Sequence, residues 1–353
     1  MARPHVLVIS PGFGNTNRGS FVQTLEGLVQ GLLQNGIAVR QWEASSLGDE
    51  DGGLPSLQGI TAVLLLGPPT GQQWLRLIAA SAQHRSIPMF WMLAANSLTL
   101  PQPVLGFLKA YPWIQLLTPS RWSARVISCL LAQEKTTGFE APEGQRHPLV
   151  VPHGVEIAPE RVPPVTDRAL AHAVAGTTGR KGTEELFEAM DLLPDEQLVA
   201  YADATALGWV QGLAEGHPNV RVVRAYNGDA TPGFWRHETF VQPSRAEGFG
   251  LCAVEAWMLG ARVIMRSDTG EPILPGVTHI PAKHGEIWEG GDGAVLHNTK
   301  NVLDPLRIAH PAAIADAIVK ERCEPAPDRP APYVQDAFRY AVAIAPFVTK
   351  VRE

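Results

Sequence analysis

The residues with the clearest chemical potential lie within the segment 244–255, where two carboxylates flank a glycine-rich turn. Gly248 and Gly250 permit positive φ angles and let the backbone approach a ligand closely. A helix predicted over residues 250–259 would begin inside this turn. Its first N–H groups, which have no intrahelical partner, could then bind an anion. The spacing predicts an anion site with the carboxylate of Glu247 beside it.

Helical periodicity predicts that Glu255 is buried. The residue falls inside an apolar stripe formed by Leu251, Val254, Met258 and Leu259. A carboxylate in that position costs free energy unless it accepts hydrogen bonds. The hydroxyl pair of a ligand can donate them, and so can backbone N–H groups or an arginine. The periodicity therefore leaves a ligand-binding and a structural interpretation open.

Two adjacent cations, Arg180 and Lys181, lie in a second glycine-containing loop, residues 175–182, which reads AGTTGRKG. The loop follows a predicted strand and precedes a helix predicted over residues 183–193. Two positive charges at such a position could neutralise a diphosphate leaving group. A solvated basic loop at the start of a helix is the alternative.

Short β-branched runs alternate with amphipathic helical stretches along most of the chain, which is the pattern of α/β proteins with parallel sheets. We expect a doubly wound domain over residues 1–157, a proline-rich linker at 158–167, and a second doubly wound domain over 168–332. A final helical run, 333–353, packs on the second domain or crosses back to the first. The predicted strands are 5–10, 37–42, 61–66, 88–93, 114–118 and 149–151, then 170–175, 197–201, 220–225, 239–242 and 262–266.

Composition and charge disfavour several classes of function. The net charge of −6 gives no overall attraction to nucleic acid, which disfavours it as a partner without excluding a local basic patch. Three cysteines without metal spacing favour a reducing, cytoplasmic setting. No apolar run approaches the ~18 residues of a membrane span. The one Asp-x-Asp, at Asp49 and Asp51, lies in a predicted solvated loop, so we expect neither a metal ion nor another cofactor.

Glu247 and Glu255, within PSRAEGFGLCAVEAWMLGARVI, resemble the Glu-x7-Glu motif of retaining GT-B glycosyltransferases of family 4. The resemblance implies two Rossmann-like domains facing a cleft, with the nucleotide-sugar donor on the C-terminal one and the acceptor on the N-terminal one. It implies that Glu247 lies near the hydroxyls of the transferred sugar and that Glu255 accepts from the ribose hydroxyls. It places the remaining donor contacts at Ser244, Gly248, Phe249, Gly250 and Leu251.

The basic loop is also similar to the family pattern, with Lys181 and Gly182 in step. It departs at Thr177, where the family usually has an arginine, so Arg180 is the candidate replacement. Gly14, in the loop after the first strand, would approach the donor from the N-terminal domain, although this loop could also be a simple turn.

Acceptor contacts are weakly specified. Asn96 follows the strand predicted at 88–93, where the family often has a histidine, and could offer a polar contact. Trp91, within that strand, could stack on an acceptor sugar, but an aromatic in a strand is more often part of the core. The sequence leaves the acceptor open among a lipid, a glycan, a small molecule, a protein and a modified base.

The function we expect is transfer of a sugar from a nucleoside-diphosphate sugar to an acceptor hydroxyl, with retention at the anomeric carbon. Glu247, Arg180 and Lys181 are the expected catalytic residues. A sugar-nucleotide 2-epimerase and a catalytically silent nucleotide-sugar-binding module are the alternatives. A nicotinamide dehydrogenase is suggested by Glu43, but Asn17 stands where a dinucleotide fingerprint needs its third glycine. The donor base, the sugar and the oligomeric state are not encoded in a readable motif.

Overall fold

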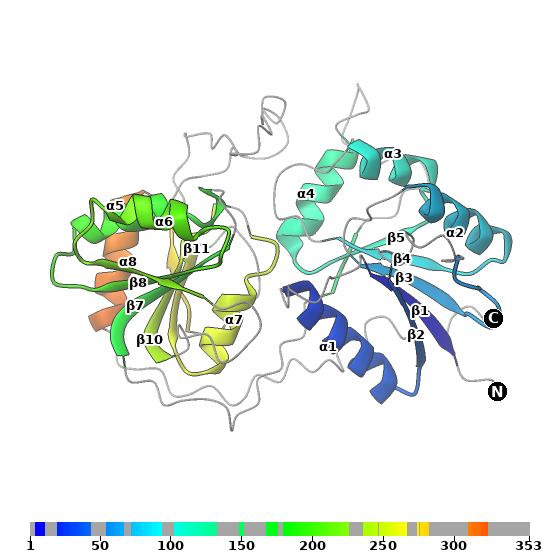
Figure 1. The fold of residues 1–353 in the computed structure, drawn as a ribbon, viewed down its shortest axis with the longest axis horizontal. Coiled ribbons are helices and arrows are strands. Elements are labelled where there is room, and N and C mark those ends of the chain that lie inside the picture. The colour runs from blue at the N-terminus through cyan, green and yellow to red at the C-terminus, as the bar shows by residue number, and fades with distance from the viewer. Residues whose placement is uncertain are drawn as a thin grey trace. The chain divides into compact units, whose positions relative to one another are not determined.

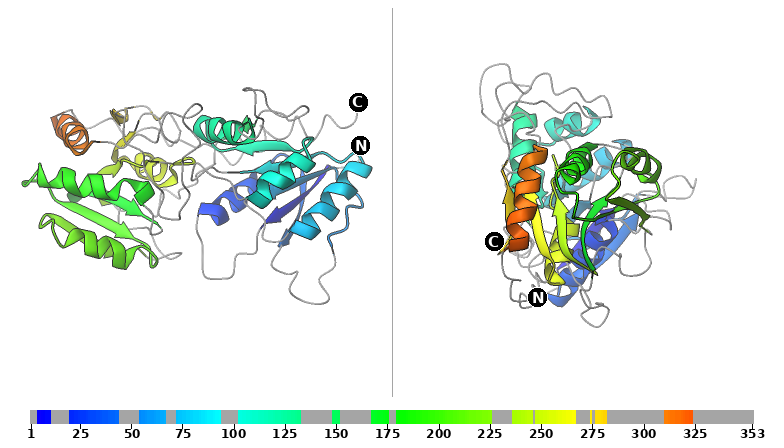
Figure 2. Two further views of the ribbon diagram at one scale, coloured as in Figure 1. Left: turned by 90° about the horizontal axis from the view of Figure 1, so that it is seen from above. Right: turned by 90° about the vertical axis from the view of Figure 1, so that its left-hand side faces the viewer.

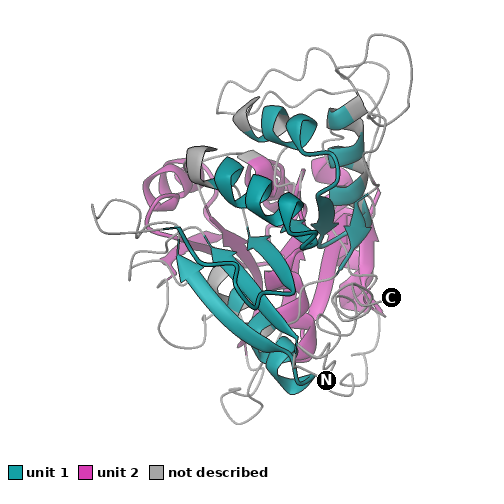
Figure 3. Ribbon diagram, turned by 90° about the vertical axis from the view of Figure 1, so that its right-hand side faces the viewer, with its two compact units in different colours: residues 1–156, 334–353 teal, residues 157–333 magenta. Residues whose placement is uncertain are grey.

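The chain divides into two compact units in a computed structural model, Met1–Glu156 with Val334–Glu353 as unit 1 and Ile157–Tyr333 as unit 2 (Figure 3). The predicted linker, apart from Asp167, and the predicted C-terminal helix lie outside the residues that the structure describes. The described residues are 4–10, 20–43, 54–66, 72–93, 102–132, 148–151, 167–175, 179–225, 236–245, 247–266, 274, 276–281 and 310–323.

Unit 1 is built on a parallel sheet in the order β2-β1-β3-β4-β5-β6 (Figure 1). In this order the first strand of the chain lies between the second and the third, as in flavodoxin-like folds. The core lies between the sheet and its helices, because the strands are apolar almost throughout and the helices have one apolar face. The elements are β1 (His5–Ser10), α1 (Ser20–Gln34), β2 (Ala38–Glu43), β3 (Ala62–Leu66), α2 (Gln72–His84), β4 (Met89–Met92), α3 (Gln102–Ala110), β5 (Gln115–Thr118), α4 (Arg121–Ala132) and β6 (Leu149–Val150).

Unit 2 contains a second parallel sheet, in the order β12-β11-β10-β7-β8-β9. Numbered within the unit, this is the 3-2-1-4-5-6 order of Rossmann folds, so the direction of winding reverses between β7 and β10. The strands are β7 (Asp167–Val174), β8 (Leu198–Ala202), β9 (Val220–Arg224), β10 (His237–Gln242), β11 (Arg262–Arg266) and β12 (Thr278–Ile280).

The helices of unit 2 divide between the two faces of this sheet (Figures 1 and 2). α5 (Thr183–Asp191), α6 (Leu207–Ala214) and α8 (Pro311–Cys323) share one core with the inward side chains of the strands. α7 (Leu251–Met258) packs on β10 and β11 and contributes none of its buried residues to that core. The connections through α5 and α6 run in one direction from the switch point, and the connection through α7 runs in the other. Because each connection is right-handed, these two sets of helices must lie on opposite faces of the sheet.

The predicted fold class, two doubly wound parallel sheets, is confirmed. Three elements were not predicted: α3, β12 and α8. Both helices have a proline within their first two positions, Pro103 and Pro311. Proline breaks the interior of a helix but fits its first turn, where an N–H group would have no partner anyway. The two prolines, which in the sequence suggest loops, therefore mark the first turns of these helices.

Trp91 corrects one prediction of the site. It lies in β4, is fully buried, and meets Phe107 of α3 edge-on, with ring centroids 5.5 Å apart. A side chain with no exposed surface presents no face to an acceptor sugar. Trp91 is therefore a core residue, which was the alternative interpretation of an aromatic in a strand.

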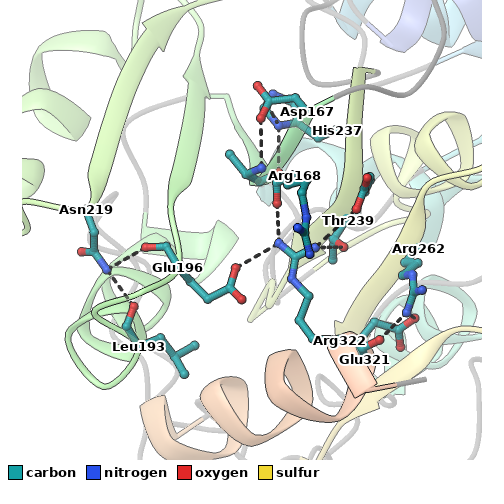
Figure 4. Close-up of polar contacts among 12 residues, drawn as sticks. Asp167, Arg168, Leu193, Glu196, Asn219, His237, Thr239, Arg262, Glu321 and Arg322 are labelled. Atoms are coloured by element: carbon teal, nitrogen blue, oxygen red, sulfur yellow. Dashed lines mark hydrogen bonds and ion pairs between the residues drawn. The ribbon is translucent and has the colours of Figure 1, made fainter. Parts of the chain in front are cut away.

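The last turn of α8 is tied to the opposite end of the sheet from the β7 and β10 carboxyl ends (Figure 4). Arg322 donates to the backbone carbonyl of Arg168 and to Glu196, at 2.9 Å, and lies 3.8 Å from Glu238. The backbone carbonyl of the neighbouring Glu321 accepts from Arg262, and its carboxylate accepts from Thr278 and lies 3.8 Å from Arg262. These contacts connect α8 to five other segments of unit 2.

We expect Arg322→Met to lower the free energy of unfolding by about 1–3 kcal/mol, because it leaves a carbonyl and a carboxylate without their donor. Lys320→Met removes an exposed charge from the same helix and serves as the matched control. Chemical unfolding of both variants checks this. Equal stability of the two variants would show that the Arg322 contacts contribute nothing.

Candidate functional site

Two strand-to-helix loops meet at the switch point of unit 2. The first leads from β7 through a 3-10 turn at Gly179–Lys181 into α5, and the second, residues 243–250, leads from β10 into α7. β7 and β10 are parallel neighbours, so their carboxyl ends lie side by side. The backbone N–H of Arg245 donates to the carbonyl of Arg180 over 2.7 Å, which joins the loops directly. Ligands of open α/β sheets bind at such a point.

The sequence-predicted residues Lys181 and Glu247 form an ion pair across these loops. Lys181 Nζ lies 2.5 Å from Glu247 Oε2, and both side chains are about nine-tenths buried. Gln242 Nε2 and Ser244 Oγ donate to the same oxygen over 3.2 and 3.3 Å. Among the described residues, the hydrogen bonds of Glu247 from Lys181, Gln242 and Ser244 all go to Oε2, which fixes the carboxylate by one oxygen.

The charges of the basic loop keep Glu247 ionised. Burial alone would raise the pKa of its carboxyl. The positive charges of Lys181 and Arg180, with the hydrogen bonds from Lys181 and Ser244, outweigh burial, and the pKa of Glu247 is lowered from its ordinary value. The basic loop therefore favours the ionised form of the Glu247 carboxyl.

Glycines at the starts of α5 and α7 let the two loops approach each other. Gly182 and Gly250 are the N-cap residues, with φ of +68° and +93°, and neither helix has a side-chain cap. A Cβ at Gly182 would lie 2.9 Å from the carbonyl carbon of Pro243 and closer still to its oxygen. The backbone geometry thus requires glycine at both positions, next to the loops that carry Lys181 and Glu247.

His172 supports the site from within the sheet. It is fully buried on β7, with Nδ1 2.9 Å from the carbonyl of Val241 and Nε2 3.1 Å from Thr183 Oγ1. A carbonyl only accepts, so Nδ1 carries the proton and Nε2 accepts from Thr183. Burial, and the nearby charge of Lys181, lower the pKa of His172 to about 4. The neutral ring therefore joins β7, β10 and the first residue of α5.

Glu255 is buried, as the apolar stripe on its helix predicts. It lies in the same electrostatic neighbourhood as Lys181 and Glu247, because all three act on Cys252 in the first turn of α7. Burial first, and then the charge of Glu255, raises the pKa of the Cys252 thiol to about 12, so this cysteine is neutral. Glu247 therefore lies in the loop before α7, in contact with the basic loop, and Glu255 lies in α7 itself.

The structure describes the predicted catalytic residues and most of the predicted donor-binding residues on the two loops and α7, and Lys181 and Ser244 contact Glu247 there. These residues are Arg180, Lys181, Ser244, Glu247, Gly248, Phe249, Gly250, Leu251 and Glu255. Gly14, Asn96 and Thr177 lie outside the described residues. The sequence missed Gln242, Arg245 and His172. Gln242 ends a predicted strand five residues before its partner Glu247, but no local pattern records their contact. Arg245 sits within the motif, but its partner Glu185 lies 60 residues away in the chain, so only the three-dimensional structure identifies it.

No group of three or more His, Cys, Asp and Glu side chains is placed to hold a metal ion within the described ranges. No helix in that part of the chain is long and apolar enough to cross a membrane.

The fold is shared with solved glycosyltransferase structures. A sucrose-phosphate synthase from Thermosynechococcus elongatus aligns with a TM-score of 0.58 and 15% identity over 99% of this chain and 97% of its own. A glycosyltransferase from Rickettsia africae gives 0.55 and 11% over 99% of both chains. An alpha-glucosyltransferase solved with UDP and a 13-mer DNA containing an HMU base gives 0.54 and 12% over 76% of this chain and 81% of its own.

No protein-family model matches the chain, and no curated protein matches it in sequence. Because the sequence identities to these solved structures are low, the structural similarity establishes the architecture of the chain alone. The chain has the GT-B fold of glycosyltransferases, with two Rossmann-like domains.

We expect Gly182→Ala to destabilise the protein by more than about 1 kcal/mol, because an L-residue is strained in the left-handed region and its Cβ meets Pro243. Gly212→Ala is the control, since Gly212 lies in α6 with nothing near its Cβ position. That change should stabilise by roughly 0.5–1 kcal/mol. Urea unfolding of both variants gives the comparison, and shifts of the same sign would contradict the argument.

His172 should make stability depend on acid pH. Its folded pKa of about 4 lies below the ordinary 6.5, so the unfolded chain binds the proton first as pH falls. Its contribution is therefore complete above about pH 6.5 and is lost between pH 6.5 and 4, at up to about 1.4 kcal/mol per pH unit. His172→Asn should show a shallower slope in this window, and parallel slopes would refute the assignment.

Proposed function

We propose that the protein transfers a sugar from a nucleoside-diphosphate sugar to an acceptor hydroxyl, with the donor bound at the loops of unit 2. The observation that carries the proposal is the buried Lys181–Glu247 pair, placed between two uncapped helix N-termini at the Rossmann switch point. Such a site offers donors for phosphate oxygens and an acceptor for sugar hydroxyls within a few ångströms. The GT-B architecture supports the same class of reaction.

The diphosphate would be held by groups of both loops. An ammonium has three N–H donors, and Lys181 uses one of them on Glu247, so the other two remain for phosphate oxygens. Arg180 adds a second cation from the same turn, and the first-turn amides of α5 and α7 add backbone donors. Charge that develops on the leaving group would meet these donors without reorganisation, and we propose no metal ion and no other cofactor.

The two glutamates would position the donor at its two ends. Glu247 is anchored through Oε2 by its three donors, and its Oε1 would accept from a hydroxyl of the transferred sugar. Glu255, which is buried on α7, would accept from the ribose hydroxyls, as the resemblance of the motif implies. Binding energy from such groups holds the donor in a reactive orientation, which lowers the entropic part of the activation barrier.

We propose that the reaction retains the anomeric configuration. The bond from the anomeric carbon to the diphosphate oxygen breaks while the acceptor oxygen bonds to that carbon on the same face. The acceptor proton passes to a diphosphate oxygen, so the products are the glycosylated acceptor and a nucleoside diphosphate. The protein contributes leaving-group stabilisation by Arg180 and Lys181 and sugar orientation by Glu247.

The first test is a thermal-shift panel of UDP-, GDP-, ADP- and TDP-sugars on the full chain, followed by turnover with the donor that stabilises most. Arg180→Ala/Lys181→Ala should lower kcat/KM at least about 10³-fold, since one donor to developing negative charge contributes about 10²–10³. The control is Arg221→Ala/Lys320→Ala, which removes two exposed cations from the same unit. Near-normal transfer by the Arg180/Lys181 variant would overturn the assignment.

Product analysis separates the remaining alternatives. Release of nucleoside diphosphate together with a glycosylated product of unchanged anomeric configuration is the expected result. An epimerised nucleotide sugar would identify an epimerase, and an inverted product would contradict retention alone. Binding without turnover across a broad acceptor panel would favour a silent nucleotide-sugar-binding module.

A further inference from the structure

Arg245 lies within the second site loop but does not point its charge at the Lys181–Glu247 pair. Its Nε donates to Glu185 Oε1 over 2.5 Å and its terminal nitrogen to Glu184 Oε2 over 2.9 Å. Both acceptors are in the first turn of α5, 60 and 61 residues away in the chain. The side chain of Arg245 is about nine-tenths buried. One guanidinium therefore bridges the loop that carries Glu247 to the helix that follows Lys181.

Two further contacts lie at the same junction. The N–H of Arg245 donates to the carbonyl of Arg180, so main chain and side chain of one residue bind both ends of the first loop. Gly182 abuts the carbonyl of Pro243 where any Cβ would clash. Together, the three contacts hold the residues on either side of Lys181, so they limit how far Lys181 can move from Glu247.

The energetics of Glu185 argue against a purely stabilising role for these contacts. The Oε2 atom of Glu185 is buried and has no hydrogen-bond partner. Burial raises the pKa of this carboxyl from its ordinary value, even though Arg245 acts in the opposite direction. A half-satisfied buried carboxylate costs free energy, and apolar residues of similar size often stabilise as well as a buried ion pair or better. A requirement for a fixed geometry of the two loops therefore explains the cluster better than a gain in stability does.

We propose that Arg245, with Glu184 and Glu185, is a positioning latch that sets the spacing between the Lys181 loop and the Glu247 loop for donor turnover. The inference rests on the proposed function and deepens it. Arg245 does not act on the reacting atoms itself. It acts through Arg180, Lys181 and Glu247, whose relative placement decides whether phosphate donors and the sugar acceptor reach one ligand together. A misplacement of about 1 Å at such a site can cost about 10²-fold in rate.

The test separates geometry from stability by two variants. Arg245→Met leaves Glu185 buried without its cation, so both the unfolding midpoint and kcat should fall. Arg245→Met/Glu185→Met replaces the buried pair by apolar side chains and should recover the unfolding midpoint. The latch predicts that kcat of the double variant stays about 10- to 100-fold below the wild type, with the donor KM within about threefold.

Recovery of kcat together with the unfolding midpoint would overturn the latch, and so would a normal kcat in Arg245→Met. Arg245→Lys, which keeps the charge but loses the fork that bridges two carboxylates, should restore stability better than kcat. Glu188→Met, which removes a more exposed carboxylate from the same helix, is the control and should change neither.

Amide hydrogen exchange gives a readout that does not depend on transfer activity. In the double variant, exchange should speed up both at residues 179–182 and at residues 247–250, while α6 remains unchanged. Unaltered exchange at both loops would overturn the latch even if the wild type transfers sugar. If the wild type transfers no sugar but exchange rises at both loops, the latch stands as a structural device and the proposed function fails.

Discussion

The buried ion pair of Lys181 and Glu247 is the constraint on which the proposed donor site depends. Two opposite charges withdrawn from water are tolerated only when they meet closely and their remaining polar atoms are matched. Here the partners are 66 residues apart and come within 2.5 Å. The Rossmann strand order makes this possible, because it places β7 beside β10 and ends both strands at the same edge. Fold and site are therefore linked through one electrostatic contact.

The neighbouring residues serve that contact in different ways. Gly182 and Gly250 remove the side chains that would hold the loops apart, and His172 fixes the strand ends below them as a neutral ring. Arg245 joins the two loops through its hydrogen bonds to Glu185 and to the carbonyl of Arg180. Catalytic groups held by packed neighbours in this way need little reorganisation when charge develops, which is where most electrostatic catalysis arises.

Much of this arrangement could be predicted from local sequence patterns. Alternating periodicity gave the two doubly wound domains, and a single carboxylate in an apolar helical stripe identified Glu255 as buried. The direct pairing of Lys181 with Glu247 was not predicted, since each is intelligible alone as a ligand-binding residue and nothing local records their distance. Arg245 was missed for the same reason. For Trp91 the sequence suggested a ligand contact that the structure does not show, because an aromatic side chain that can stack on a sugar can equally pack in the core.

Hydrogen exchange of the full chain with and without a stabilising nucleoside-diphosphate sugar tests the central claim most directly, because it locates the donor without altering a residue. The account predicts that the donor slows amide exchange in two segments of unit 2, residues 179–185 and residues 247–254. Tight binding of a donor that leaves both segments unchanged and protects other parts of the chain would contradict it.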